Sequence, residues 1–385
     1  MSGTESVVVD DPVDERWLEA VYRVRVPTSR IEARAEALAL EQSVELPLDA
    51  VGDPRIRDEV VARVVGIAAW PESGAGSAAS DFAVTLRLAV ETTGREPGQL
   101  LNMLFGNSSL QDDVALVDVH LPAGLAQHFG GPRYGIAGIR ALTGVARGAL
   151  TCTALKPVGL AARELASLAA TFARAGIDVV KDDHGLADQE SAPFAVRVPR
   201  IQRAIDAVNH ADGRRCMYAP SLTGDLGTMR AHATLARDCG VRMFLVAPMV
   251  SGVAALAALA GELEAPILAH PALGGCSRIA RPLLLGRLFR LFGADATIFP
   301  HAGGRFGLPR SECEAIATAA RTSWHGLAPT LPVPAGGIDV ERAAEVSRVY
   351  GENTMLLVGG SLLTARGRLD QRCRAFVAAV KGATP

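Results

Sequence analysis

The stretch GIDVVKDDHGLADQ, residues 176–189, decides the fold of this chain. Its short apolar, β-branched run ends on Lys181, and two aspartates and a histidine follow without a spacer. A charged cluster is most often a solvated loop. Reactive side chains directly after a strand-like run are also typical of a strand that opens onto an active site. The other strand-like runs of the chain decide between these two interpretations.

Eight apolar runs of this kind occur from residue 148 onward, and helix-compatible segments separate most of them. Between the first two runs, Leu165, Leu168 and Phe172 recur at helical spacing. Eight alternating β and α units predict a (β/α)8 barrel. A doubly wound sheet would use fewer strands and a glycine-rich dinucleotide turn, which KPVGLAA (156–162) matches poorly. The eight runs are GALTCTALK (148–156), IDVVKDD (177–183), RCMYAPSLTG (215–224), VRMFLVAPMV (241–250), APILAHPAL (265–273), DATIFPHAGG (295–304), PTLPVPAGG (329–337) and NTMLLVGGS (353–361).

Most of these runs end in reactive or small residues. In a barrel all strand C-termini open onto one face, so residues far apart in sequence converge there. This placement favours a functional interpretation of the KDDH cluster at the end of the second strand. The strand-end residues are Lys156, Lys181, Asp182, Asp183, His184, Ser221, His270, His301, Gly336, Gly337, Gly359 and Gly360.

The first part of the chain has a different pattern. WLEAVYRVRV (17–26) and FAVTLRLAV (82–90) alternate like half-buried strands, and residues 30–43 have helical spacing. The glycines and proline of HFGGPRYG (128–135) mark a connection. The predicted fold is therefore α/β: an N-terminal α+β domain of the ferredoxin-like type over residues 1–135, then a C-terminal (β/α)8 TIM barrel over residues 136–385.

Composition excludes several classes of protein. The 385 residues carry a formal net charge of -2 without a basic block, which argues against nucleic-acid binding. The longest uncharged stretch, residues 244–260, is better explained by a strand running into a buried helix than by a membrane span. Six scattered cysteines lack the spacing of a zinc site or disulfide framework. Reduced thiols in a cytoplasmic protein are expected.

The residue types at the first two strand ends indicate acid–base or metal chemistry. Carboxylates such as Asp183 bind Mg²⁺, and a buried lysine has a lowered pKa that makes it a base or a carbamate former. His184 is either a nitrogen ligand or a neutral hydrogen-bonding group. Lys156 is a proton carrier if it lies beside Lys181, and an ordinary surface lysine otherwise.

The later strand ends suggest an anion site. His270 and His301 could each be a core histidine, although two at equivalent positions of adjacent strands favour a function. The pairs Gly336-Gly337 and Gly359-Gly360 are either tight turns or a phosphate site, which barrels often form there from unobstructed N–H groups. Arg305 could add a charge-assisted contact to an anionic substrate.

Taken together, these motifs resemble the RuBisCO superfamily, and within it the RuBisCO-like proteins of form IV. GIDVVKDDHGLAD is similar to the family's G-x-D-x-x-K-D-D-E signature, and TALKPVGL to its first-strand motif. ILAH, IFPHAGGRFG, PVPAGGI and LLVGG follow in family order. ALEQS (39–43) and FGNSS (105–109) resemble the segments that cover a neighbouring subunit's barrel.

The resemblance implies a homodimer with shared active sites, in which Glu41 and Asn107 come from the partner. It implies that Lys181, as a carbamate, binds Mg²⁺ with Asp183 and His184. Lys156 would be the proton-transfer residue and His270 a polar contact to the substrate. The remaining implied substrate and phosphate contacts are His301, Arg305, Gly336, Gly337, Gly359 and Gly360.

Departures from the carboxylase pattern argue against CO2 fixation. His184 replaces the glutamate ligand, and imidazole suits softer metals than Mg²⁺. Val158 replaces a second lysine, and Arg305 stands near the place of the lysine that steadies the new carboxylate. The resemblance still implies the chemistry that the family shares, stabilisation of an enolate in a phosphorylated, sugar-like substrate.

The KDDH form resembles the branch linked to apionate breakdown, which implies decarboxylation of 3-oxo-isoapionate 4-phosphate with Lys156 protonating the enolate. Decarboxylation needs no base to create the enolate, which fits a site that has lost a lysine. The alternatives are a methionine-salvage enolase acting on 2,3-diketo-5-methylthiopentyl 1-phosphate, an isomerase acting on 5-methylthioribulose 1-phosphate, and a catalytically silent binding protein.

Overall fold

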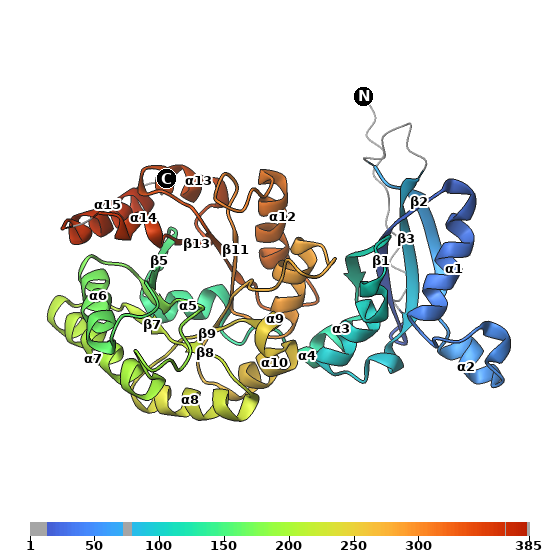
Figure 1. Ribbon diagram of the computed structural model, residues 1–385, viewed down its shortest axis with the longest axis horizontal. Coiled ribbons are helices and arrows are strands. Elements are labelled where there is room, and N and C mark those ends of the chain that lie inside the picture. Colours follow the sequence, from blue (N-terminus) through green and yellow to red (C-terminus); the bar gives the residue numbers. More distant parts are fainter. Residues whose placement is uncertain (1–13, 72–78, 366, 383–385) are drawn as a thin grey trace. The chain divides into compact units, whose positions relative to one another are not determined.

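The computed structural model describes residues 14–71, 79–365 and 367–382. The chain divides into two compact units, residues 1–128 and 129–385, shown in Figure 1. The division lies before the boundary predicted at residues 135 and 136. The reason is a pair of hydrogen bonds: the N–H groups of Tyr134 and Gly135 both donate to the buried Asp295 carboxylate, each at 2.7 Å, which joins this connection to the barrel.

The N-terminal unit is an antiparallel sheet with helices. Its strand order is β2-β3-β1-β4, the arrangement of a ferredoxin-like fold. β1 alternates buried and partly exposed residues, as expected for a sheet with one face on the core. The strands are β1 (Trp17–Val26), β2 (Arg63–Ala69), β3 (Ser80–Ala89) and β4 (Val114–His120). The helices are α1 (Ile31–Glu41), α2 (Pro54–Glu59), α3 (Pro97–Phe105) and α4 (Ala123–Phe129), with short 3₁₀ turns at Thr28–Arg30, Leu48–Ala50, Val90–Thr93 and Asn107–Leu110.

The C-terminal unit is the predicted barrel, and all eight strand runs of the sequence are strands in it. They pair in parallel in chain order. The seventh run, residues 329–337, is rich in proline. The strands are β5 (Leu150–Leu155), β6 (Val179–Asp182), β7 (Met217–Ala219) continued by β8 (Ser221–Leu222), β9 (Phe244–Val246), β10 (Ile267–Ala269), β11 (Ala296–Pro300), β12 (Leu331–Ala335) and β13 (Met355–Leu357).

Helices surround this parallel sheet (Figure 1). The helix predicted between the first two strands is present as α6, and its buried face includes Leu165 and Phe172. The helices are α5 (Gly135–Thr143), α6 (Ala162–Arg174), α7 (Phe194–Asp212), α8 (Leu226–Asp238), α9 (Pro248–Ser251), α10 (Val253–Glu262), a π-helical turn (Pro282–Leu288) running into α11 (Phe289–Leu291), α12 (Arg310–Arg321), a 3₁₀ turn (Val340–Arg342), α13 (Ala343–Tyr350), α14 (Gly360–Leu363) and α15 (Leu369–Lys381). No helix of the described residues is both long and apolar enough to span a bilayer.

Proline explains an interruption in the barrel between β12 and β13. The N–H of Leu331 donates to the carbonyl of Asp295, towards β11, so the alternate residues Pro332 and Pro334 face β13. Proline has no N–H, and a regular ladder cannot form on that side. The hydroxyl of Thr354 instead donates to the Pro332 carbonyl at 3.0 Å. Side chains from all parts of the barrel fill its interior, which leaves the strand C-termini as the place for a site.

Candidate active site

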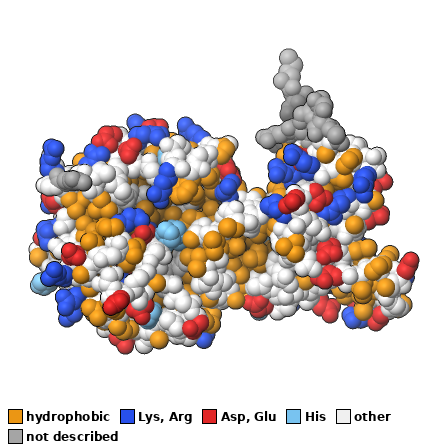
Figure 2. All heavy atoms as spheres, in the orientation of Figure 1, with side chains coloured by type: hydrophobic (Ala, Val, Ile, Leu, Met, Phe, Trp, Pro, Cys, Tyr) orange, Lys and Arg blue, Asp and Glu red, His pale blue; other side chains and the backbone are white. Residues whose placement is uncertain are grey.

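A cavity of about 430 Å³ opens at the C-terminal ends of the barrel strands. Lys156, Lys181, Asp183, His184 and His270, from the ends of β5, β6 and β10, all line it. The strand ends therefore converge, as the barrel geometry predicted. Figure 2 shows histidine atoms beside a hollow with hydrophobic side chains on this face of the barrel.

Lys181 lies at the buried floor of the cavity, near the C-terminal end of β6. Its side chain is 2% exposed, and its Nζ donates a hydrogen bond to the Asp182 carbonyl at 2.9 Å. Burial lowers the pKa of the amine, and the charge of Lys156 acts in the same direction, although neighbouring acidic groups oppose both. A larger fraction of this amine is consequently neutral and nucleophilic than at an exposed lysine.

Lys156 and Asp183 form an ion pair on the cavity wall. The Lys156 Nζ lies 2.6 Å from Asp183 Oδ2, and the lysine keeps partial access to solvent. Burial by itself raises the pKa of Asp183, but hydrogen bonds from His184 and Lys156 outweigh that effect and leave the pKa well below its usual range. Asp183 therefore stays ionised and holds the Lys156 ammonium at the cavity.

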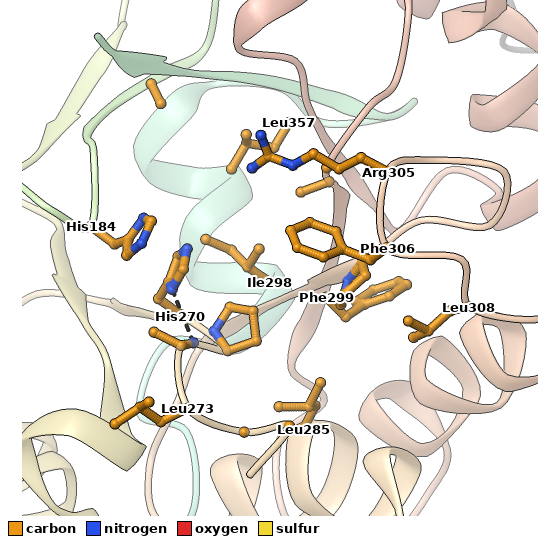
Figure 3. A pocket seen from close by; sticks show the side chains of 18 of the residues that line it. His184, His270, Leu273, Leu285, Ile298, Phe299, Arg305, Phe306, Leu308 and Leu357 are labelled. Carbon is orange, nitrogen blue, oxygen red and sulfur yellow. Dashed lines mark hydrogen bonds between the residues drawn. The ribbon is translucent and has the colours of Figure 1, made fainter. Parts of the chain in front are cut away.

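His184 and His270 stack face to face. Their ring centroids are 4.2 Å apart and the planes differ by 11°, and Figure 3 shows the two rings side by side at one end of the cavity. His184 Nδ1 is 3.1 Å from Asp183 Oδ1, and a carboxylate can only accept. His184 therefore carries its proton on Nδ1, which leaves Nε2 free to act as an acceptor or a ligand.

His270 has the opposite tautomer. Its Nδ1 accepts a hydrogen bond of 3.1 Å from the backbone N–H of Ala272. Burial lowers the pKa of His270 to about 2, with Lys181 and His184 adding to the shift, so the ring is neutral. A neutral imidazole that accepts at Nδ1 carries its proton on Nε2. His270 is thus placed to act as a hydrogen-bond donor, through Nε2, towards a substrate oxygen.

Buried polar contacts that sequence reasoning missed hold the end of β6 in place. The Asp182 carboxylate accepts from Arg197 at 3.1 Å, from the Tyr218 hydroxyl at 2.7 Å and from the Ser221 N–H at 3.1 Å. Arg197 and Asp182 both have fully buried side chains. An arginine in a helical segment looks like a solvated residue in the sequence, so no signal distinguished Arg197. Ser221 was predicted at the site, and its backbone contributes here to positioning.

The loop after β11 packs against the glycine pair after β12. The Arg305 N–H donates to the Gly336 carbonyl at 3.0 Å, and the Phe306 ring occupies the space that a Cβ on Gly336 would need. A Cβ on Gly304 would lie 2.3 Å from the Gly336 carbonyl oxygen. These glycines allow two backbones to approach closely. Arg305 and Gly336 line the cavity.

Other predicted contacts lie outside the lining of this cavity among the described residues. His301 is buried, and its Nδ1 lies 3.4 Å from the Tyr350 hydroxyl. Gly359 is behind Lys156, whose Cε would lie 3.9 Å from a Cβ at that position. Gly337, Gly359 and Gly360 are also absent from the lining. The structure therefore brings the lysines, Asp183, His184, His270, Arg305 and Gly336 together, but it does not add these four residues to the wall.

Comparison with known proteins identifies the family. Residues 135–295 match the family model of the ribulose bisphosphate carboxylase large chain, catalytic domain. The chain is 51% identical over 360 residues to ribulose bisphosphate carboxylase-like protein 1 of Rhodopseudomonas palustris, covering 93% of this chain and 96% of the relative. It belongs to the RuBisCO-like proteins.

Two further relatives refine this assignment. The 5-methylthioribulose-1-phosphate isomerase of Rhodospirillum rubrum is 49% identical over 368 residues, covering 95% of this chain and 96% of the relative. The crystal structure of a Rubisco-like protein from Rhodopseudomonas palustris matches with a TM-score of 0.87 at 47% identity, over 96% of this chain and 98% of that chain. The family and the two-domain fold predicted from the sequence are confirmed.

Glu41 and Asn107, for which the sequence predicts a role in a partner's active site, lie together in the N-terminal unit. They are far apart in sequence, yet Asn107 Nδ2 donates to Glu41 Oε1 at 3.2 Å on an exposed surface. Gln42, the next residue after Glu41, is buried and donates to the Leu104 carbonyl at 2.8 Å. The end of α1 is thereby fixed, and the pair forms one polar patch.

The metal predicted for this RuBisCO-like site needs three donors. Asp183 and His184 provide two, and in the described part of the chain they belong to no cluster of three or more histidine, cysteine or acidic residues. Lys181 completes the set only as a carbamate, because an amine that has gained CO2 presents carboxylate-like oxygens. Its buried position and lowered pKa favour the neutral amine that this reaction requires. The donor set therefore suits Mg²⁺ only in the carbamylated form, with Asp183 released from its present contacts to Lys156 and His184.

Proposed function

We propose that this RuBisCO-like protein is an isomerase of a phosphorylated keto sugar, acting on 5-methylthioribulose 1-phosphate. The observation that carries the proposal is the Lys156–Asp183 pair beside the neutral His270 in one cavity. The 49% identity to an enzyme named for this reaction supports the choice of substrate. It favours the isomerase alternative over the decarboxylase that the KDDH motif suggested.

The reaction moves a proton between two adjacent carbons, one of which is the carbonyl carbon. A base removes a proton from the hydroxyl-bearing carbon next to the ketone, and the electron pair forms an enediolate. The proton then returns to the former carbonyl carbon, and the carbonyl moves to the carbon that lost the proton. The product has the same atoms as the substrate, so no oxidant or further reactant is needed. Charge develops on the carbonyl oxygen, and catalysis requires donors fixed near it.

Each residue has a part in this scheme. Lys156 carries the proton, because its Nζ reaches the cavity; as the free amine it accepts the substrate proton and as the ammonium it returns it. His270 donates its Nε2–H to the enediolate oxygen. Lys181 as a carbamate, with Asp183 and His184, would hold Mg²⁺, which supplies positive charge beside that oxygen. Arg305 and the Gly336 turn would face the phosphate, and the contacts predicted for Gly337, Gly359 and Gly360 stay predictions.

The proposed assembly is a homodimer. Glu41 and Asn107 form an exposed polar patch in this chain, and we assign this patch to the barrel mouth of a partner subunit. Glu41→Gln should then lower turnover without lowering the melting temperature. Mixing this variant with Lys156→Met subunits should restore part of the activity, because such a heterodimer contains one intact site.

The direct test supplies purified protein with 5-methylthioribulose 1-phosphate in deuterium oxide. Formation of an isomer with deuterium at a carbon next to the carbonyl, followed by phosphorus and proton NMR, is the expected result. The same protein is incubated with 3-oxo-isoapionate 4-phosphate and with the diketo phosphate of the enolase. CO2 release from the first, or an enol absorbance from the second, without isomerisation of the methylthio sugar would overturn the proposal.

A further inference from the structure

The cavity has two chemically different halves. Lys156, Lys181, Asp183 and His184 lie in one half, and His270 borders both. Large apolar side chains form the other half, and Figure 3 shows them beyond His270 as seen from His184. These side chains are Leu273, Leu285, Phe299, Phe306 and Leu308.

We propose that Leu273, Leu285, Phe306 and Leu308 form an apolar subsite that holds the nonpolar tail of a singly phosphorylated substrate. Leu273 sets the preference for a thioether over a hydroxyl in that tail. The choice of a thioether rests on the proposed function, but the apolar character of the subsite rests on the cavity itself.

Leu273 is the unusual residue of this subsite. Its φ is +60°, in the left-handed region, and its side chain is 56% exposed. A leucine rarely adopts this conformation, and glycine would occupy it without strain. An exposed leucine gains little from burial within its own chain. Residues held in such conformations are concentrated at ligand-binding positions, where contact with the ligand offsets the strain.

The turn that presents Leu273 also fixes His270. The Ala272 N–H donates to His270 Nδ1 at 3.1 Å, the Gly274 N–H donates to the Pro271 carbonyl at 2.9 Å, and the Cys276 N–H donates to the Leu273 carbonyl at 3.1 Å. These hydrogen bonds hold the turn in one conformation. The position of Leu273 relative to the His270 imidazole is therefore fixed.

Phe306 and Leu308 form the opposite wall. The Phe306 ring packs over Gly336 and is 54% exposed, and the Arg305 guanidinium lies 4.9 Å from its centroid. Leu285 is 2% exposed and closes the wall from the π-helical turn. A nonpolar group placed between Leu273 and Phe306 would cover both exposed faces, which is favourable because apolar area leaves water.

Within the described residues, the apolar half of the cavity offers no second site for an anion. Arg281 also lines the cavity, but its Nη1 lies 2.8 Å from Glu312 Oε1. Lys156 is paired with Asp183. Among the cavity cations in the described part of the chain, Arg305 lies over the Phe306 ring and forms no ion pair with a carboxylate. The arrangement suits one phosphate near Arg305, on the Phe306 side of the cavity, with the nonpolar group towards Leu273, and it disfavours a bisphosphate.

Binding of two unreactive probes separates this inference from the proposed function. Wild-type protein is titrated calorimetrically with 4-(methylthio)butyl phosphate and with 4-hydroxybutyl phosphate. We expect the thioether probe to bind about tenfold to a hundredfold more tightly, the range for burying one small apolar group. Leu273→Gly should lower this ratio severalfold, because one of the apolar walls is lost. Because glycine suits a positive φ, the variant should not lower the melting temperature.

His325→Gly is the matched control. His325 also has a positive φ, of 48°, but it does not line the cavity, so its variant should keep the wild-type ratio. Equal affinities of wild-type protein for the two probes, or an unchanged ratio in Leu273→Gly, would overturn the subsite. A lower affinity ratio between the two probes in Leu273→Gly, and not in His325→Gly, would support the subsite. If wild-type protein then failed to isomerise the methylthio sugar, the proposed function would fail while the subsite stood.

Discussion

Replacing Arg197 with methionine should destabilise the barrel and disable its site together. The Arg197 Nη2 lies 3.1 Å from Asp182 Oδ2, and neither side chain is exposed. Asp182 stands between Lys181 and Asp183, so whatever moves it also moves two residues of the cavity. The perturbation therefore tests whether a buried ion pair positions the end of β6.

The magnitude follows from what remains after the substitution. Burial raises the pKa of Asp182, and the Arg197 charge is the largest influence that opposes it. Removing one partner of a buried pair leaves an uncompensated carboxylate, which costs about 3–5 kcal/mol. Tyr218→Phe removes one hydrogen bond to the same carboxylate, 2.7 Å long. That loss should cost less, about 1.5–3 kcal/mol.

The assay is urea unfolding followed by circular dichroism, with turnover measured on the same samples. The double variant Asp182→Asn, Arg197→Met contains no unpaired charge and should recover part of the stability that Arg197→Met loses. A loss below about 1 kcal/mol in Arg197→Met would refute the reasoning, because it lies within the range of exposed pairs. A double variant less stable than the single one would refute it as well.

Three other predictions concern the site and its surroundings. Lys156→Met should lower turnover about 10²- to 10⁴-fold, measured by deuterium incorporation into the product, and unchanged turnover would exclude this residue as the proton carrier. Mg²⁺ with bicarbonate should raise the melting temperature of wild-type protein and not of Lys181→Met, and an equal rise in both would argue against a carbamate. Burial raises the pKa of the Cys152 thiol to about 12, so its stabilising contribution is complete below about pH 9 and is lost as the pH rises towards 12. Cys152→Ala should therefore show a smaller fall in unfolding free energy between pH 9 and 11, and an identical fall would contradict this.

Several features of the site were predictable because they depend on short-range patterns. A run such as IDVVKDD predicts a buried strand with charged residues at its end, because the pattern of apolar and polar residues that marks a strand is only a few residues long. Barrel geometry then places Lys156, Lys181 and His270 on one rim, although more than a hundred residues separate the first from the last.

Other features depend on which atoms meet. His301 occupies the same kind of strand end as His270, yet it turns towards Tyr350 on α13 while His270 faces the cavity. Gly336 belongs to a predicted phosphate site, and only the structure shows that its loop also packs closely against Gly304. The apolar wall of Leu273 and Phe306 had no signal, because single exposed apolar residues in loops are common.

The sequence by itself determined the order of the elements, the family and the set of strand ends that carry reactive groups, because all three are recorded in local periodicity and motif order. Only the tertiary structure decided the protonation of those groups and the shape of their cavity. Lys181 and His270 have lowered pKa values, and Asp183 stays ionised, because of burial and neighbours that distant segments supply. Such effects fall off within a few ångströms, so they exist only once the chain has folded.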